Sequence, residues 1–320
     1  MWSRFKGKGL LAFSDPAGAK ACLALNEILC KESISGERKL VSNKEYPFYS
    51  QFKSDIEIID NGDVPDFTKK LTGKIDWIFT GTSHPDSSGC FELRFLENAD
   101  VRSHAFIDHW TNFHLRFELG SKMIFPDTIF VIDESAKQSA VADGLPEERI
   151  ELLENPYLMY LRQYGASNLT REEFCKKLNI ESKKKIILYA PDPVSLRKEG
   201  GQNETDILKE LMDKEITNNF TVVLKLHPLQ PLGEILTLIE QNDLKIITDD
   251  KFMPSDVFAN ADIIVGFYSN YLLEAATVNK NIIRYQLEGN DRLMPAPAGK
   301  MPGRSVADKR SLLTELNNIR

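Results

Sequence analysis

Short apolar runs rich in β-branched and aromatic residues alternate with amphipathic stretches of helix length along most of this chain. Such alternation is typical of α/β folds built on parallel sheets. In the first half the pattern predicts both strands and helices. The strands are residues 10–13, 39–42, 56–59, 77–80, 103–107 and 128–132, and the helices are residues 19–29, 66–71, 91–98 and 135–142.

Residues 161–185 interrupt the pattern, because they are polar and helix-prone and have few strand signals. The alternation then restarts, with strands at 186–190, 221–226, 245–248, 263–265 and 281–285 and helices at 204–212, 232–241, 255–260, 270–277 and 311–319. We therefore predict two facing, doubly wound, Rossmann-like domains with parallel sheets. Their bounds are 1–160 and 186–305, with an interdomain connection at 161–185 and a closing C-terminal helix at 306–320.

Composition excludes several classes of protein. Of the 320 residues, 42% are hydrophobic, which is enough for two ordinary cores and argues against disorder. The net charge is −7 and there is no basic stripe, so we expect no nucleic-acid partner. Cys22, Cys30, Cys90 and Cys175 form no C-x-x-C pair, which fits neither a structural zinc site nor a disulfide framework and suits a reducing cytoplasm.

The first eight residues are basic, and the apolar run that follows them, residues 9–13, is too short for a signal peptide or a membrane span. No later segment reaches about eighteen consecutive apolar residues. We expect a soluble cytoplasmic protein whose basic N-terminus could touch the inner face of an anionic membrane.

Ligands of open parallel sheets bind beyond the carboxyl ends of the strands, so the residues after each strand are the candidates. In the second half, one such segment runs from Gly266 to Asn270. Ser269 or Asn270 is predicted to cap the next helix, whose N-terminus would attract phosphate. Glu274 follows about one turn later, where a carboxylate could bind ribose hydroxyls. The alternative is an ordinary helix cap with Glu274 on the surface.

A second segment reads Lys225-Leu226-His227-Pro228 at the end of a predicted strand. Pro228 forces the chain out of the sheet, which places His227 at the edge of the crevice. Its imidazole could donate to a phosphate oxygen and stabilise a departing nucleotide. The alternative is a structural histidine, but Ser195, His227 and Ser269 all follow strands of the same predicted sheet, and this favours a ligand role.

The His-Pro pair, the serine turn about forty residues later and Glu274-Ala275-Ala276 resemble the donor half of GT-B glycosyltransferases. The similarity is closest to bacterial sialyl- and polysialyltransferases, glycerophosphotransferases and UDP-N-acetylglucosamine 2-epimerases. It implies that His227 and Ser269 contact the donor phosphate, that Glu274 binds the ribose and that the base lies near Met253. The implied nucleotide and phosphate site is Ser195, Lys225, His227, Met253, Ser269, Asn270 and Glu274.

Two departures from these relatives matter. The epimerases have a Ser-Gly-Gly turn where this chain has Ser269-Asn270-Tyr271, and the acidic-acidic-glycine motif of the sialyltransferases is not found.

In the first half, Asp15 follows the first predicted strand among small residues that would let a ligand approach the backbone. No G-x-G-x-x-G motif follows that strand, so NAD binding is not supported. Thr82 follows the fourth strand in a small, polar loop that resembles the glycan-side loops of GT-B enzymes, and Glu92 comes shortly after it.

The segment after the fifth strand is the richest in chemistry. Asp108, His109, Asn112 and Arg116 combine acid, imidazole, amide and guanidinium groups that suit sugar recognition, and Asp108 or His109 could deprotonate an acceptor hydroxyl. We expect the aromatic residues among them, Trp110, Phe113 and Phe117, to pack in the core as a helix face, because they are three and four apart. The spacing of His104, His109 and His114 does not suit a metal site, so no metal is predicted.

These residues predict a metal-independent, inverting glycosyltransferase that uses a CMP- or UDP-linked sugar as substrate and needs no further cofactor. The acceptor is a glycan of capsule or other surface polysaccharide, bound by residues 1–160, while 186–305 bind the donor. Asp15 and Asp108 are rival general bases, with a slight preference for Asp108, and His227 stabilises the leaving phosphate. The alternatives are a nucleotide-sugar 2-epimerase or hydrolase on the same fold, and a non-catalytic nucleotide- or glycan-binding protein.

Overall fold

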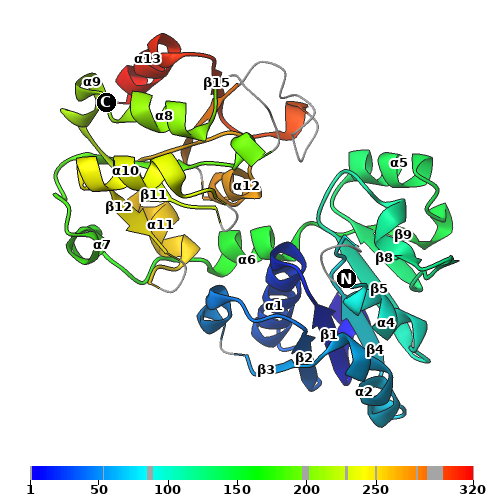
Figure 1. Ribbon diagram of the computed structural model, residues 1–320. Coiled ribbons are helices and arrows are strands. Elements are labelled where there is room, and N and C mark those ends of the chain that lie inside the picture. Colours follow the sequence, from blue (N-terminus) through cyan, green and yellow to red (C-terminus); the bar gives the residue numbers. More distant parts are fainter. Residues whose placement is uncertain are drawn as a thin grey trace. The chain divides into compact units, whose positions relative to one another are not determined.

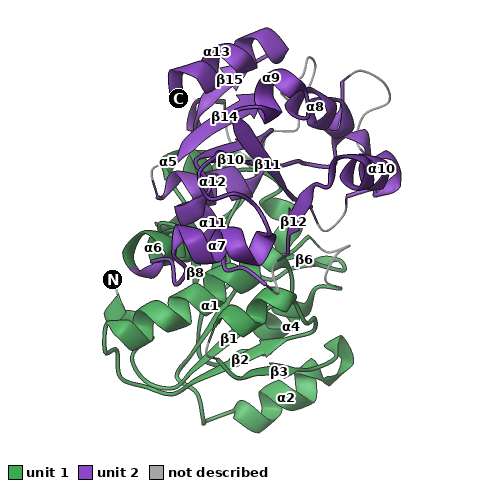
Figure 2. Ribbon diagram, turned by 90° about the vertical axis from the view of Figure 1, so that its left-hand side faces the viewer, with its two compact units in different colours: residues 1–163 green, residues 164–320 purple. Residues whose placement is uncertain are grey.

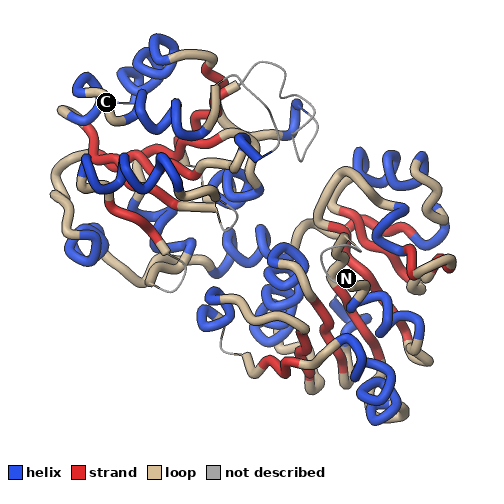
Figure 3. The backbone as a smooth tube through the Cα atoms, in the orientation of Figure 1, coloured by secondary structure: helices blue, strands red, loops and turns tan. Residues whose placement is uncertain are grey.

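The computed structural model describes residues 2–52, 54–84, 89–196, 202–227, 230–248, 251–278, 280–286 and 298–319. The chain divides into two compact units, Met1–Gln163 (unit 1) and Tyr164–Arg320 (unit 2) (Figure 2). Each unit is a twisted sheet of parallel strands with helices on both faces (Figures 1 and 3). The predicted fold class is therefore confirmed. Among the described helices, none combines the length and the hydropathy that crossing a bilayer requires.

The sheet of unit 1 has the strand order β3-β2-β1-β4-β5-β8-β9. Its strands are Gly9–Phe13 (β1), Arg38–Ser42 (β2), Ile56–Ile58 (β3), Trp77–Thr80 (β4), Arg102–Ile107 (β5), Thr128–Val131 (β8) and Ile150–Leu152 (β9). The α-helices that begin in this unit are Pro16–Lys31 (α1), Val64–Leu71 (α2), Phe91–Glu97 (α4), Glu134–Ala142 (α5) and Pro156–Tyr164 (α6).

The register of the central strands decides which loops meet. Ala12 of β1 pairs with Thr80 of β4, and Thr80 pairs with Ala105 of β5. These three strands therefore end within two residues of one another along the sheet. The loops that follow them carry Asp15 and Asp108, among other polar residues, and they start side by side.

Unit 1 has an apolar core on each face of its sheet. On one face, residues of β1, β4, α2 and α4 form a cluster that includes Leu10, Ile78 and Phe95. On the other, Phe5 is fully buried and packs edge-on against Trp77 and Phe79. Phe5 lies in the short 3-10 helix Trp2–Phe5, so the N-terminal segment is part of this core.

The sheet of unit 2 has the order β12-β11-β10-β13-β14-β15. Its strands are Lys185–Ala190 (β10), Phe220–Lys225 (β11), Lys245–Ile247 (β12), Ile263–Gly266 (β13), Asn281–Tyr285 (β14) and Arg304–Val306 (β15). Its helices are Arg171–Leu178 (α7), Glu204–Leu211 (α8), Lys214–Thr217 (α9), Gly233–Asn242 (α10), Pro254–Asn260 (α11), Asn270–Ala276 (α12) and Lys309–Ile319 (α13).

All predicted strands and helices are present, with ends that differ by a few residues. The prediction missed the edge strands β9 and β15, the hairpin of Glu118–Leu119 (β6) and Lys122–Met123 (β7), and the helices α6, α7 and α9. The edge strands have three residues each and carry glutamate or arginine, which weakens their apolar signal. Helix α7 lies within the polar stretch 161–185, and its Phe174 packs on Phe252 of unit 2 at 5.2 Å between ring centroids.

Candidate functional sites in the two units

Three carboxylates lie near one another at the carboxyl ends of β1, β4 and β5 in unit 1. Asp15 caps α1, and its Oδ1 accepts a hydrogen bond from the N–H of Gly18 at 2.6 Å. Asp108 follows β5 and is 8% exposed, while Glu92 projects from the first turn of α4 and is 3% exposed. The charges of Asp108 and Glu92 both act on Asp15, so the three form one electrostatic cluster.

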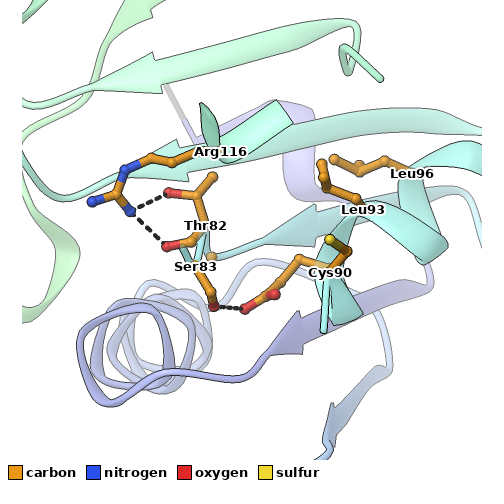
Figure 4. Close-up of a pocket in the computed structure, with 8 residues that line it drawn as sticks. Thr82, Ser83, Cys90, Leu93, Leu96 and Arg116 are labelled. Atoms are coloured by element: carbon orange, nitrogen blue, oxygen red, sulfur yellow. Dashed lines mark hydrogen bonds between the residues drawn. The ribbon is translucent and has the colours of Figure 1, made fainter. Parts of the chain in front are cut away.

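Arg116 supplies the cation of this cluster. Its Nη1 donates to the carbonyl of Thr82 at 2.8 Å and to Thr82 Oγ1 at 3.2 Å, and it lies 3.8 Å from Oδ1 of Asp108. The hydroxyl of Thr82 in turn donates to the carbonyl of Phe106 at 3.1 Å. Figure 4 shows Arg116 pointing toward Thr82. One cation is thus grouped with three carboxyl groups, so the acidic side chains of the cluster outnumber the basic one.

Glu92 connects two of the loops. Its Oε1 accepts a hydrogen bond from the hydroxyl of Ser83 at 2.6 Å, beside a small pocket (Figure 4). Burial raises the pKa of Glu92, although hydrogen bonds from Ser83 and from the backbone of Ser14 partly offset this effect. The pocket is lined by Gly81, Thr82, Ser83, Cys90, Glu92, Leu93, Leu96 and Arg116.

Asp15 has the most strongly perturbed acidity of the cluster. Burial, and then the charges of Asp108 and Glu92, raise its pKa from 3.8 to about 7, while the N–H of Gly18 and the charge of Arg116 act in the opposite direction. A carboxylate with a pKa near neutrality can accept a proton in one step and release it in the next.

Tyr46 also borders this cluster, and the sequence analysis missed it. Its hydroxyl donates to the carbonyl of Ser14 at 2.9 Å. Burial, and then the charges of Asp15 and Glu92, raise its pKa to about 12. Tyr46 lies a few residues after β2, which is next to β1, so the search for residues after strands could have found it.

The glycines of this region pack against each other. A Cβ atom on Gly81 would lie 2.7 Å from the Cα of Gly18, a distance that real Cβ atoms essentially never show. The first turn of α1 and the loop after β4 are therefore in close contact. This contact brings the loops after β1 and β4 together, and with them Asp15 and Thr82.

The loop after β5 holds the other predicted acceptor residues. His109 Nδ1 lies 2.9 Å from the hydroxyl of Thr111, and burial lowers the pKa of this histidine. Asn112 is exposed and adopts the left-handed backbone conformation, with φ of 59°. Within the described residues, neither side chain forms a hydrogen bond to Asp15, Glu92 or Asp108, so His109 and Asn112 flank the cluster.

The aromatic residues of this loop pack as expected but without the expected helix. Phe113 and Phe117 are buried in the core, whereas Trp110 is half-buried and donates from Nε1 to the carboxylate of Asp133 at 3.1 Å. The prediction of a helix face was wrong, because only the 3-10 turn His114–Phe117 forms here. Among the described residues, no group of three or more His, Cys, Asp or Glu side chains could hold a metal ion.

In unit 2, Ser195 is exposed but is held by a glutamate that the sequence analysis did not consider. Its N–H donates to Oε2 of Glu204 at 3.0 Å and its hydroxyl donates to Oε1 at 2.5 Å. Gln230 Nε2 donates to the same Oε1 at 2.8 Å, and Glu204 is 1% exposed. Glu204 thus joins the loop after β10 to Gln230 in the segment after β11, and Ser195 serves this scaffold.

Lys225, the last residue of β11, and His227 after it are half-buried at the carboxyl end of the strand. Lys225 Nζ lies 5.9 Å from the ring centroid of Tyr271. The carbonyl of His227 accepts a hydrogen bond from the N–H of Gln230 at 2.9 Å. Pro228, on which the predicted exit from the sheet depends, lies outside the described residues.

Ser269 caps α12 as predicted, since its Oγ accepts a hydrogen bond from the N–H of Tyr271 at 3.2 Å. Asn270 is the first residue of this helix. Glu274 is 5% exposed, so the alternative of a surface glutamate was wrong. Met253 caps α11 and its sulfur accepts a hydrogen bond from Nδ2 of Asn168 at 3.5 Å.

Comparison with known proteins bears on the two units differently. Residues 163–320 match the model of the family described as CDP-Glycerol:Poly(glycerophosphate) glycerophosphotransferase. UDP-N,N'-diacetylbacillosamine 2-epimerase (hydrolyzing) from Legionella pneumophila is 28% identical over 166 residues, which are 48% of this chain and 41% of that enzyme. The match therefore spans less than half of either protein.

Solved structures of other proteins resemble nearly the whole chain. A putative UDP-N-acetylglucosamine 2-epimerase from Listeria monocytogenes has a TM-score of 0.69 at 13% identity, covering 98% of this chain and 88% of that one. The wall teichoic acid polymerase TagF has a TM-score of 0.63 at 15% identity, covering 97% of this chain and 80% of that one. The chain therefore has the GT-B fold, and the resemblance to GT-B enzymes is confirmed at this level.

Proposed function

We propose that this protein transfers a sugar from a nucleotide-activated donor to a hydroxyl of a glycan acceptor, and that unit 2 binds the donor. One observation carries the proposal: the match to the glycerophosphotransferase family covers residues 163–320, nearly the same residues as unit 2, Tyr164–Arg320. This unit contains Lys225, His227, Ser269 and Glu274 at the carboxyl ends of its strands, where α/β sheets bind nucleotides.

In this proposal, the donor phosphates lie near Lys225 and His227. As the bond between the anomeric carbon and the phosphate oxygen breaks, negative charge grows on the leaving nucleotide, and an ammonium and an imidazole can stabilise it without a metal ion. Ser269 and Asn270 also contact phosphate, Glu274 binds the ribose, and the base lies near Met253. Ser195 acts through its bonds to Glu204 and contributes to the shape of the site.

The acceptor hydroxyl needs a base, and we assign this role to Asp15. Its pKa of about 7 keeps it basic enough to accept the proton yet ionised in much of the population near neutral pH. Asp108 is 8% exposed and lies beside Arg116, which suits it to tuning the charge of Asp15. This reverses the slight preference for Asp108 that rested on sequence alone.

These roles account for the proton and for the bonds that form and break in the transfer step. The acceptor oxygen gives its proton to Asp15 and forms a bond to the anomeric carbon, while the phosphate oxygen leaves with the bonding electron pair. Attack opposite the leaving phosphate inverts the anomeric configuration. Thr82, Glu92, His109, Asn112 and Arg116 hold the acceptor or the acids around it, and we place the reaction in surface-polysaccharide synthesis in the cytoplasm.

A specific observation favours a second function, that of a nucleotide-sugar 2-epimerase or hydrolase. Such an enzyme needs several acids around one sugar, and unit 1 brings Asp15, Glu92 and Asp108 together. The partial match to a hydrolysing 2-epimerase supports the same alternative. It differs from transfer because it releases nucleotide without any acceptor.

The two functions separate in one assay. The protein is incubated with CMP-, UDP- and CDP-linked donors, with and without a mixture of glycan acceptors, and nucleotide release is measured by chromatography. Release that depends on an acceptor supports transfer, whereas equal release without one supports the epimerase or hydrolase. The absence of both turnover and nucleotide binding would contradict both.

Binding to unit 2 is tested by thermal shift with CMP, UDP and CDP, since a ligand of the native state raises its melting temperature. We expect His227→Ala and Glu274→Ala to remove the shift and to leave the unliganded melting temperature within a few degrees. His114→Ala, a half-buried histidine of unit 1, is the matched control. An unfolded His227→Ala protein, or one that still binds nucleotide, would favour a structural role for His227.

A further inference from the structure

Arg284 occupies the next-to-last position of β14 and is half-buried. Its Cα pairs with that of Gly266, the last residue of β13. Neighbouring strands of a sheet are about 4.8 Å apart. Arg284 therefore stands one strand away from the turn that carries Ser269, at the carboxyl end of the sheet.

The alternation of side chains along β14 gives the face on which Arg284 lies. The hydroxyl of Tyr285 donates to Oε2 of Glu210 in α8 at 2.5 Å, so Tyr285 is on the α8 face. Successive residues of a strand point to opposite faces. Arg284 is therefore on the other face, the face of Lys225, which lies near Tyr271 of α12.

The guanidinium of Arg284 has no ion pair and no hydrogen bond within the part of the chain that the structure describes, although its Nε is buried. Two other arginines of unit 2 are paired: Arg171 with Asp262 at 2.9 Å and Arg304 with Glu315 at 2.5 Å. The Oδ1 atom of Asn270, which follows the Gly266 turn, is also buried without a partner among the described residues.

A partly buried cation without a counter-charge is unfavourable, because its desolvation is not offset by a partner. Burial accordingly lowers the pKa of Arg284. A buried polar atom without a partner calls for an explanation, and a bound ion or ligand is one such explanation. A guanidinium binds phosphate well, because its planar N–H groups can form two parallel hydrogen bonds to the oxygens of one phosphate.

We propose that Arg284 binds a phosphate group of the nucleotide donor, a role that neither the sequence motifs nor the family match assigns to it. The proposal rests on the proposed function for its ligand, and it makes Arg284 the counter-charge of the donor phosphates on the β14 side of the Ser269 turn. Free inorganic phosphates and the diphosphate group of a nucleotide share the chemistry that Arg284 recognises.

The test uses the full-length protein and inorganic pyrophosphate, with UDP and CDP in parallel, in calorimetric titrations at fixed salt. Losing a charged hydrogen-bonding partner weakens binding by about ten- to a hundredfold, so we expect this loss in Arg284→Gln and a smaller one in Arg284→Lys. Arg304→Gln, which removes an exposed and paired arginine, is the control and should bind as the wild type does. Weakening for UDP and CDP but not pyrophosphate would assign Arg284 to the nucleotide rather than to the phosphates, and would overturn the proposal.

A second measurement checks that Arg284 lacks a partner in the unliganded protein. Removing an unpaired, half-buried charge should leave the melting temperature of Arg284→Gln unchanged or higher. A melting temperature well below that of Arg304→Gln, or unchanged pyrophosphate binding, would overturn the proposal, as would a wild type that does not bind pyrophosphate. Pyrophosphate binding needs no turnover, so the result is independent of whether the protein proves to be a transferase or an epimerase.

Discussion

Each unit buries a glutamate that accepts a hydrogen bond from a serine in a loop after a strand, but their neighbours differ. In unit 1, Glu92 accepts from Ser83 at 2.6 Å within a cluster of further carboxylates. In unit 2, Glu204 accepts from Ser195 at 2.5 Å, and the amide of Gln230 is a further donor at 2.8 Å.

The difference shows how one buried group can serve chemistry or structure. Among other acids, a buried carboxylate is pushed toward its protonated form, and burial raises the pKa of Glu92. Among hydrogen-bond donors, both carboxylate oxygens accept hydrogen bonds, and Glu204 thereby fixes the position of two loops. Unit 1 is therefore the better candidate for proton transfer, and unit 2 offers a preorganised binding site.

The largest expected effect is on catalysis by Asp15→Asn. The amide oxygen of asparagine can still accept the hydrogen bond from Gly18 and cap α1, but the side chain can no longer take a proton. We expect kcat to fall by about a hundredfold to ten-thousandfold, measured as nucleotide release. Asp133→Asn, at the cap of α5 where Asp133 accepts from Ala136 at 2.8 Å, is the matched control. Normal kcat in Asp15→Asn would remove Asp15 from the mechanism.

The next effect compares the two glutamates directly. In Glu204→Gln, one carboxylate oxygen becomes an NH2 group. That group would face a hydrogen-bond donor, because Ser195 and Gln230 together donate to both carboxylate oxygens. We expect unit 2 to lose about 3 kcal/mol of unfolding free energy. Glu92→Gln should lose less than about 1 kcal/mol from unit 1, since its oxygen can still accept from Ser83 and its carboxyl is already shifted toward the neutral form.

Urea denaturation can separate these losses. All three tryptophans, Trp2, Trp77 and Trp110, belong to unit 1, so their fluorescence reports that unit, while circular dichroism reports both. If both glutamine variants lose equal free energy, the contrast between the two glutamates is incorrect.

Asp15 should also make unit 1 less stable as the pH rises. The folded-state pKa of about 7 lies above the ordinary 3.8, so the folded protein holds this proton more tightly than the unfolded chain does. The contribution of Asp15 to the free energy of unfolding is complete below its ordinary pKa of 3.8 and is lost as the pH rises through 7. Asp15→Asn does not titrate, and near pH 8 it should be more stable than the wild type by on the order of 2 kcal/mol, measured by tryptophan fluorescence.

His104 should make unit 1 less stable as the pH falls, which is the opposite of the effect of Asp15. The size of this effect should be comparable to or smaller than that of Asp15. His104 is 5% exposed, with ring centroids of Phe5 and Phe130 at 5.4 and 5.7 Å, and burial lowers its pKa to about 4. The stability of the neutral form is present above the ordinary pKa of 6.5 and is lost as the pH falls toward 4.

Near pH 5, the free energy of unfolding of His104→Phe should therefore exceed that of the wild type by up to about 2 kcal/mol. Unit 2 should respond less to this acidification, because its single histidine is the half-buried His227. Equal acid sensitivity of wild type and His104→Phe in tryptophan fluorescence would exclude His104 as its source.

Most of the fold and part of the candidate site could be predicted from the sequence. The periodicity of apolar residues depends on local sequence, so the central strands and helices were found, whereas the short, charged β9 and β15 were not. Asp15 and Asp108 were predicted as rival general bases because residues that follow strands of one parallel sheet meet at one edge.

The sequence by itself determined the alternation of strands and helices, and with it the placement of Asp15, Asp108, His227 and Ser269 after strands. Only the tertiary structure decided which groups meet: Glu92 with Asp15, Tyr46 with Ser14, Glu204 with Ser195, and Arg284 with no described partner. The physical reason is that hydrogen bonding, burial and the pKa of a side chain depend on neighbours from distant segments, and strand order and helix packing bring these together only in the folded chain.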